Sequence, residues 1–322
     1  MTLTRRTILR SALAAPAVLT LPAQAAMTAP EGEQNAGWYR FALGTFEITV
    51  VSDGNLLVPT TTIGTNQPRE AVTSFLEDRF LDPATNYSHT NLVLIDTGDA
   101  KVLIDVGSGD KFQPTAGRVV ANLEAAGIDI EDVTHVALTH AHPDHVWGMM
   151  DDFGDEPRFP EAEYSIAAAE FDWWMTEGRV DLVPEMIQGF VVGAQNALRP
   201  VAERTTMVKG NDQIVPGVMM IDTPGHTPGH MSVMIESEGQ SMMVLGDAIT
   251  HAYASFEHPD WQFATDIDPD MAVRTRKQLL DRLATDRIAV VGYHLPFPGV
   301  GHVLRRGSAY QYVAAPWQWG DG

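Results

Sequence analysis

The heptapeptide Thr139-His140-Ala141-His142-Pro143-Asp144-His145 follows an apolar run that predicts a buried β-strand. Side chains two residues apart in extended backbone point the same way, so His140 and His142 can bind one ion. The proline then permits a turn into a helix, whose opening presents Asp144 and His145 toward a second ion. Three imidazoles and a carboxylate within six residues therefore predict a two-metal site at the end of a strand.

Three further candidate ligands, His226, Asp247 and His294, each follow a separate apolar run. Two metals about 3.5–4 Å apart need a bridging carboxylate, and Asp247 stands where a strand is predicted to end. Two other histidines, His230 and His302, compete for the same roles. His226 and His294 are preferred because each directly follows its strand and loop, so His230 and His302 are expected to contact the ligands from behind.

Short apolar runs alternate with amphipathic stretches along the chain, without a repeat or a low-complexity linker. Helices are predicted over Pro114–Ala126, Pro184–Leu198 and Asp270–Leu283. The pattern favours two packed sheets with helices outside, in one domain. The predicted strands are Phe46–Val51, Asn91–Asp96, Lys101–Asp105, Val133–Thr139, Ala162–Ile166, Met219–Asp222, Ser232–Glu236, Met242–Leu245 and Ile288–Val291.

The first 25 residues are predicted to be an export signal rather than part of the fold. Thr4–Arg10 is a twin-arginine pattern, Ala12–Leu21 is apolar but too short to span a bilayer, and Ala23–Ala25 is a small-residue cleavage site. Twin-arginine export carries folded proteins, so a periplasmic or secreted enzyme is expected. Residues 26–322 would then form the mature domain.

The composition limits partners and ligands. The 322-residue chain has a formal net charge of −21, and an acidic surface repels phosphate backbones and anionic headgroups. Nucleic-acid and membrane partners are therefore not expected. The chain has no cysteine, so only nitrogen and oxygen remain as metal ligands. Such a site suits zinc, which we expect, but also manganese, cobalt or iron.

The motif at residues 140–145 resembles the H-x-H-x-D-H element of the metallo-β-lactamase superfamily, and the three later candidates match its remaining ligands in order and rough spacing. The resemblance covers residues from about 40 to 305. It implies an α/β fold, the αββα sandwich, around a dinuclear centre. One ion would be held by His140, His142 and His226, the other by Asp144, His145 and His294, with Asp247 between them.

The resemblance also implies hydrolysis. A hydroxide that bridges the two ions is a strong nucleophile near neutral pH, and Asp144 would help to move the proton to the leaving group, with Asp247 holding both ions. Asp105 resembles the aspartate that receives a hydrogen bond from a ligating histidine in this family, which would fix the tautomer. A turn aspartate is the alternative for Asp105.

Within the superfamily, the chain looks most like the exported methyl parathion hydrolase-like lactonases, arylesterases and phosphotriesterases. The features are the twin-arginine start, Val50–Gly54, the seven ligands and Gly292–Val303. In that group aromatic side chains wall the substrate cleft, which favours neutral ring-bearing substrates. His251, four residues after Asp247, would gate the cleft or hydrogen-bond a leaving group, or else lie on a surface loop. The corresponding aromatic candidates here are Phe112, Trp173, Trp174 and Phe190.

The expected substrate is a small neutral lactone or aryl ester, with organophosphate triesters as a weaker activity. A glyoxalase II-like thioesterase and an N-acyl homoserine lactonase are the alternatives, because both share the metal motif. A penicillin-type β-lactamase is disfavoured, since those enzymes commonly carry arginine or cysteine where this chain has His145 and Asp247. A non-catalytic or redox role is disfavoured by His142, where diiron relatives have glutamate. The sequence leaves a homodimer open.

Overall fold

A computed structural model describes residues 35–151, 153–154 and 156–319. The predicted signal, residues 1–25, lies outside these residues. From Ala36 onward the chain forms one compact unit. In the described part of the chain, no helix is both long and apolar enough to cross a bilayer.

The first half of the unit forms a seven-stranded sheet in chain order. Its first four strands pair antiparallel and its last four pair parallel, so β4 belongs to both regions. A bulge between Ser52 and Gly54 interrupts the pairing of the two longest strands. The strands are β1 (Trp38–Leu43), β2 (Phe46–Pro59), β3 (Thr85–Asp96), β4 (Lys101–Ile104), β5 (His135–Ala137), β6 (Glu163–Ala167) and β7 (Thr205–Val208).

The second half forms another seven-stranded sheet, in which only β11 and β12 pair parallel. Tight turns join β8 to β9, β10 to β11 and β13 to β14, and longer segments make the other connections. The strands are β8 (Gln213–Val215), β9 (Val218–Asp222), β10 (Met231–Ser237), β11 (Gln240–Val244), β12 (Ala289–Val291), β13 (Val300–Arg306) and β14 (Ala309–Ala314).

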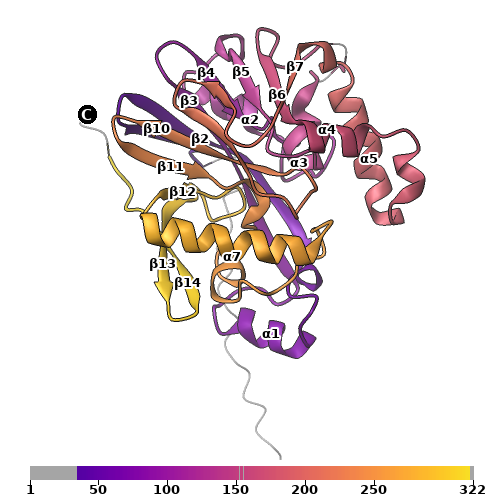
Figure 1. The fold of residues 1–322 in the computed structure, drawn as a ribbon, viewed down its shortest axis with the longest axis vertical. Coiled ribbons are helices and arrows are strands. Elements are labelled where there is room, and N and C mark those ends of the chain that lie inside the picture. Colours follow the sequence, from indigo (N-terminus) through magenta and orange to yellow (C-terminus); the bar gives the residue numbers. More distant parts are fainter. Residues whose placement is uncertain (1–34, 152, 155, 320–322) are drawn as a thin grey trace, which may run out of the picture. The chain divides into compact units, whose positions relative to one another are not determined.

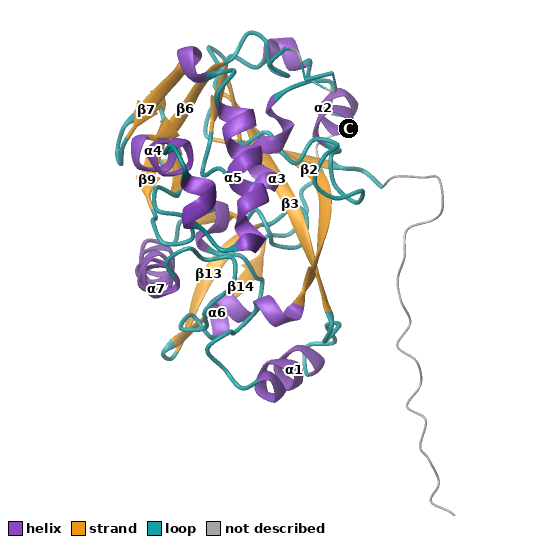
Figure 2. Cartoon of the chain, turned by 90° about the vertical axis from the view of Figure 1, so that its right-hand side faces the viewer, coloured by secondary structure: helices purple, strands orange, loops and turns teal. Residues whose placement is uncertain are grey.

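The two sheets face each other and helices cover their outer faces (Figures 1 and 2). Alternation along β3 shows why: Val93 and Ile95 pack between the sheets, whereas Leu92 and Leu94 pack under the helices. This confirms the predicted αββα sandwich. The first sheet is covered by α2 (Val119–Ala125), α3 (Pro143–Val146), α4 (Ala168–Met175) and α5 (Glu185–Leu198), and the second by α6 (Ala254–Glu257) and α7 (Pro269–Asp286).

Most predicted elements are present, and the differences lie at their ends and edges. The helix expected from Pro114 begins only at Val119. Strands β2 and β3 run well beyond their predicted bounds and form a two-stranded extension toward α1 (Arg69–Glu77), which lies at the bottom of the fold in Figure 1. Elements not predicted are β1, β7, β8, β13, β14, α1, α4, α6 and the 3-10 turns Thr60–Thr62, Ile130–Asp132, Trp147–Met149, Arg179–Leu182, Ala202–Arg204 and Gly246–Ala248.

Candidate metal centre

All seven predicted ligands meet where strands of both sheets end. Four follow β5, in the first sheet, and three follow β9, β11 and β12 in the second. The turn into α3 has Pro143 at its first position, where a missing N–H costs no helical hydrogen bond. The side chains are almost fully enclosed; the set is His140, His142, Asp144, His145, His226, Asp247 and His294.

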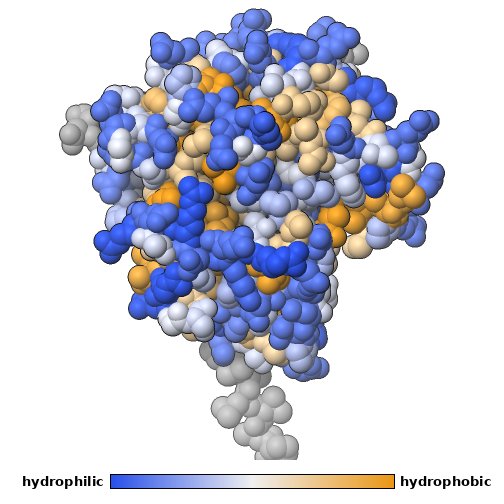
Figure 3. Space-filling model, viewed as in Figure 1, coloured by the Kyte–Doolittle hydropathy of each residue, from blue (hydrophilic) through white to orange (hydrophobic). Residues whose placement is uncertain are grey.

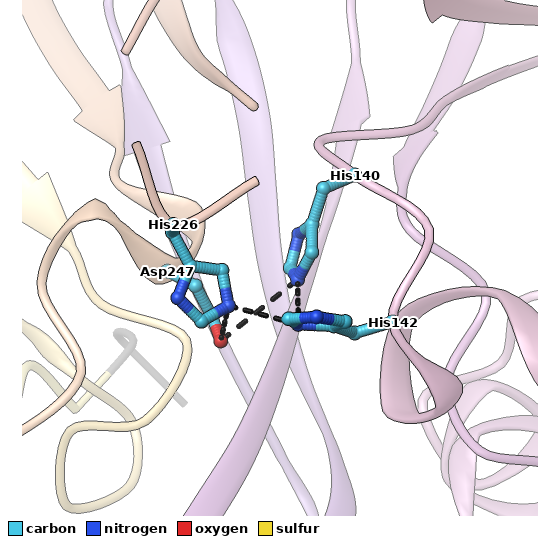
Figure 4. A group of neighbouring side chains, drawn as sticks. All are labelled: His140, His142, His226 and Asp247. Atoms are coloured by element: carbon cyan, nitrogen blue, oxygen red, sulfur yellow. Dashed lines mark hydrogen bonds and ion pairs between the residues drawn. The ribbon is translucent and has the colours of Figure 1, made fainter. Parts of the chain in front are cut away.

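Four of these side chains surround one point (Figure 4). The Nδ1 atom of His142 lies 3.1 Å from Nε2 of His140 and 2.9 Å from Nε2 of His226. Oδ2 of Asp247 lies 3.2 Å from Nε2 of His226 and 4.0 Å from Nε2 of His140. Ligand atoms about 2.1 Å from a tetrahedral zinc would be about 3.4 Å apart. The group therefore has the dimensions of one metal site.

The other three side chains form a second group beside the first. Oδ2 of Asp144 lies 3.5 Å from Nε2 of His145 and 3.4 Å from Nε2 of His294. Asp247 reaches this group as well, with Oδ1 at 3.3 Å from His145 and Oδ2 at 3.1 Å from His294. Asp247 therefore stands between two sets of ligands, as a bridging carboxylate must.

Several ligand atoms are buried with no hydrogen-bond partner: Asp144 Oδ2, His145 Nε2 and Asp247 Oδ1. Unsatisfied polar atoms of this kind are costly in a folded protein unless an ion completes them. The donors are all imidazole nitrogen or carboxylate oxygen. The residues present therefore fit two divalent ions.

The carboxylates favour positive charge at His145, His226 and His294, whereas burial holds the pKa values of His140 and His142 well below the ordinary value. Burial lowers the pKa of His226, but Asp247 and Asp266 outweigh it and raise that pKa to about 9. Burial raises the pKa of Asp247, yet His294, His145 and His226 bring it well below its ordinary value. Groups that hold protons this strongly lie where a cation is stabilised. A bound metal ion would displace these protons.

Acceptors behind the ligands fix the histidine tautomers. Asp105 accepts from His145 Nδ1 at 2.8 Å, and Asp266 accepts from His226 Nδ1 at 2.9 Å. Asp105 adopts a left-handed backbone, φ 63°, in which an aspartate is strained, and Thr139 holds it with backbone and hydroxyl hydrogen bonds. Asp266 was not predicted; it lies 40 residues from His226 in the chain, with no local motif to reveal it.

The two other candidate histidines, His230 and His302, lie in different environments. Nε2 of His230 accepts from the backbone N–H of Asp247 at 2.9 Å, and Nδ1 lies 3.1 Å from the carbonyl of Thr223, so His230 contacts a ligand from behind. His302 is exposed on β13, between two buried positions. The prediction that His302 lies beside the ligands is corrected, because the alternation of that strand turns its side chain outward.

A known protein family matches the part of the chain that carries most of these ligands. The sequence profile of the metallo-beta-lactamase superfamily matches residues 86–293, which include six of the seven ligands and end one residue before His294. The chain belongs to the metallo-β-lactamase superfamily. An N-acyl homoserine lactonase of Bacillus sp. is 24% identical over 220 residues, which cover 62% of this chain and 79% of that one.

Two solved structures resemble most of the chain. The hydrolase AbOPH is 30% identical with a TM-score of 0.82, covering 89% of this chain and 100% of that one. AidC, described as a dizinc quorum-quenching lactonase in complex with a product, N-hexanoyl-L-homoserine, is 26% identical with a TM-score of 0.83, covering 88% and 98%. This superfamily member is accordingly a metal-dependent hydrolase.

A cavity of about 260 Å³ opens over the metal centre of this metallo-β-lactamase fold. Five ligands form its floor, and its walls are largely apolar. Figure 3 shows apolar side chains at the surface beside α5, where Met186 of the cavity rim is 72% exposed. The apolar wall residues include Leu56, Leu57, Val58, Pro59, Ile63, Phe112, Met186, Ile187, Phe190 and Phe263.

Of the four aromatic residues predicted to wall the cleft, two line the cavity and two do not. Phe112 and Phe190 line the cavity, with ring centroids 6.0 Å apart. Trp174 is fully buried behind His142, and Trp173 packs on Trp174 rather than lining the cavity. Their position on α4 explains this, because that helix packs into the core under the ligand loop.

His251 lines the cavity as a neutral side chain. Its Nδ1 accepts from the backbone N–H groups of Tyr253, at 3.1 Å, and Ala254, at 3.0 Å. Burial, with a smaller contribution from Arg79, lowers the pKa of His251 to about 4. With Nδ1 accepting, the proton of the neutral ring is on Nε2, so His251 has one hydrogen-bond donor available at ordinary pH.

Proposed function

We propose that this enzyme hydrolyses neutral lactones and aryl esters with two zinc ions, and organophosphate triesters more weakly. The observation that carries the proposal is the position of the seven-ligand site at the floor of an apolar cavity. In the described chain, no lysine or arginine is among the residues that line it. A neutral ester can therefore enter without an unpaired charge, while its apolar part packs on the wall.

Different residues of the chain have different roles in the proposed reaction. When bound, the two ions would lower the pKa of a water to near 7 and polarise the carbonyl oxygen of the ester. Asp144 lines the cavity beside the other ligands of the second group, where its carboxylate can take a proton and pass it to the leaving oxygen. Phe112 and Phe190 exclude water and orient the ring of the substrate.

N-acyl homoserine lactones are the specific lactones that the comparisons support. The related Bacillus protein is named for that activity, and AidC is described with the corresponding product. Such a substrate joins a polar lactone ring to an acyl chain. The apolar rim formed by Leu57, Met186 and Ile187 suits the acyl chain.

A glyoxalase II-like thioesterase is the alternative that the cavity disfavours. Glutathione esters are anionic and need cationic groups to bind them. Among residues 35–319 as the structure describes them, the lining of this cavity includes the carboxylates of Asp144 and Asp247 and no lysine or arginine.

The test compares kcat/KM on zinc-loaded protein for dihydrocoumarin, an aryl acetate, N-hexanoyl homoserine lactone and S-lactoylglutathione. We expect the neutral lactones and the aryl ester to exceed the thioester by more than about tenfold, equivalent to about 1.4 kcal/mol of transition-state stabilisation. A thioester preference of that size would instead establish the thioesterase and refute our interpretation of the cavity.

We also propose that residues 1–25 are a twin-arginine signal and that the mature enzyme is periplasmic or secreted. The proposal is supported by Thr4–Arg10 and Ala23–Ala25.

A further inference from the structure

Glu170 is a fully buried carboxylate of α4 outside the set of metal ligands. Its two oxygens accept four hydrogen bonds. Oε1 accepts from the backbone N–H of Ala141 at 3.0 Å and from the indole N–H of Trp174 at 2.6 Å. Oε2 accepts from the hydroxyl of Thr227 at 2.7 Å and from the backbone N–H of Gly229 at 2.9 Å.

Three of the four donors belong to segments that carry ligands. Ala141 lies between His140 and His142, after the last residues of β5, and Thr227 directly follows His226, after β9. Glu170 therefore connects a ligand loop of the first sheet with a ligand loop of the second. Both loops serve the same group, the one completed by Asp247.

The fourth donor, the indole N–H of Trp174, also supports the group of ligands completed by Asp247. The indole ring of Trp174 stands edge-on to His142, with ring centroids 5.6 Å apart and an interplanar angle of 80°. Because Glu170 holds the indole N–H, it also fixes the surface against which His142 rests. Three of the four ligands of this group thus depend on one carboxylate.

The close approach of the two segments is built into the sequence. A Cβ atom at Gly229 would lie 2.2 Å from the backbone nitrogen of Glu170, so only glycine lets the His226 loop come this near to α4. A buried carboxylate is costly, and core packing alone gives no reason for one here. Donors from two separate loops do give a reason.

We infer that Glu170 is a positioning residue that sets the separation of the His140–His142 loop and the His226 loop, and thereby the retention of the ion bound by that group. Glu170 is neither one of the seven ligands nor part of the cavity lining. The inference depends on one part of the proposed function, namely that the group formed by His140, His142, His226 and Asp247 binds a metal ion.

The test measures the release of zinc from the two sites into a chromogenic chelator. His142→Ala and His294→Ala assign the release phases, because each removes a ligand from one group only. Glu170→Gln keeps the shape, but its single amide oxygen can accept from only one of the two donor pairs, and its NH2 group then faces a backbone N–H of the other pair. We expect it to speed release from the His142 group by about tenfold or more and to leave the other phase unchanged.

A milder pair of variants guards against a Glu170 variant that does not fold. Thr227→Val removes the hydroxyl with little change in volume, and Thr227→Ser restores a hydroxyl at the same position. We expect faster release from the His142 group in Thr227→Val and wild-type release in Thr227→Ser. Asp53→Asn is the control for a buried carboxylate, since Asp53 accepts from Ser108 and Val119 and contacts neither ligand loop.

Unchanged release in both Glu170→Gln and Thr227→Val would overturn the inference. So would equal acceleration of both phases, or the same selective acceleration in Asp53→Asn, because those results indicate general loosening of the fold. Wild-type protein that binds two ions but hydrolyses none of the lactones or esters would refute the proposed function and leave this inference standing.

Discussion

At the scale of single residues, the position of Asp247 decides how the two metal groups depend on each other. Its Oδ1 faces His145 and its Oδ2 faces both His226 and His294. With both ions bound, a carboxylate in this place would neutralise part of their charge and so reduce their mutual repulsion. The two sites should therefore fill or empty together when Asp247 is changed.

Asp247→Ala should lose most of both ions and nearly all hydrolysis, because neither group keeps its shared ligand. Metal content after dialysis and kcat/KM on an aryl acetate measure this. Asp286→Ala is the control: Asp286 is an exposed carboxylate that pairs with Arg282 at 3.9 Å. Two tightly held ions in Asp247→Ala would contradict the bridging role.

His251 should contribute to loss of stability in acid. The pKa of His251 is about 4 in the folded protein, against 6.5 for a free histidine. Between these pH values the unfolded chain binds a proton at His251 and the folded protein does not. Stability is therefore lost as pH falls from 6.5 toward 4. Between about pH 7 and about pH 5 this amounts to about 2 kcal/mol.

His251→Gln removes that titration while keeping an acceptor for the N–H groups of Tyr253 and Ala254. Urea unfolding at the two pH values should show a smaller pH dependence in the variant, by about 2 kcal/mol. The ligand histidines titrate in both proteins and cancel in the comparison. An identical pH dependence would show that His251 is not buried in its neutral form.

The ligands could be predicted from sequence because each follows an apolar run that ends in the same cleft. Spacing predicted all seven of the residues that the structure brings together. Asp266 and Glu170 could not be predicted, since their partners are brought near only by the packing of helices and loops. The prediction for Trp173 and Trp174 was wrong because the sequence does not show that α4 packs into the core and contributes no residue to the cavity lining.

At the scale of elements, α5 supplies one wall of the cavity and the extension of β2 and β3 supplies another. Phe190→Ala should reduce kcat/KM on ring-bearing esters more than on small aliphatic esters, by about 1–3 kcal/mol, because the substrate ring loses its packing partner. Trp173→Ala is the control, since Trp173 does not line the cavity. Equal losses on both kinds of ester in Phe190→Ala would exclude a ring-packing role.

Strands buried on both faces could be predicted, and partly exposed strands at or next to the sheet edges could not. Leu92–Ile95 of β3 is a continuous apolar run that packs on both faces, which reads clearly as a strand. In β13 and β14, by contrast, much of the sequence is polar and exposed. Their pairing at the edge of the second sheet comes from the hairpin register, which apolar periodicity does not report.

At the scale of the whole molecule, each metal group takes ligands from both sheets: His140 and His142 meet His226, and Asp144 and His145 meet His294. Bound ions should therefore stabilise the packing of one half on the other. Chelation should lower Tm, since each ion adds about 2.7 kcal/mol when free metal is at one hundred times its dissociation constant. Calorimetry with and without chelator measures the difference, and equal Tm values would contradict it.

The proposed export signal lies outside the described residues, so its test uses the full-length chain in cells. Changing Arg5 and Arg6 to lysine should leave unprocessed precursor in the cytoplasm, because twin-arginine transport recognises the paired guanidinium groups. Cell fractionation followed by immunoblotting measures this, with Arg10→Lys as the control. Undiminished periplasmic yield would reject the twin-arginine assignment and leave the enzyme assignment intact.

The two-stranded extension of β2 and β3 has a consequence for how such an enzyme can change over generations. Leu56–Pro59 and its partners Asn86 and Ser88 face the cavity but hold no metal ligand. Mutations there can alter which ester is accepted while the reacting groups stay where they are. New substrate preferences are thus accessible by small steps, each of which leaves a working catalyst for selection to act on.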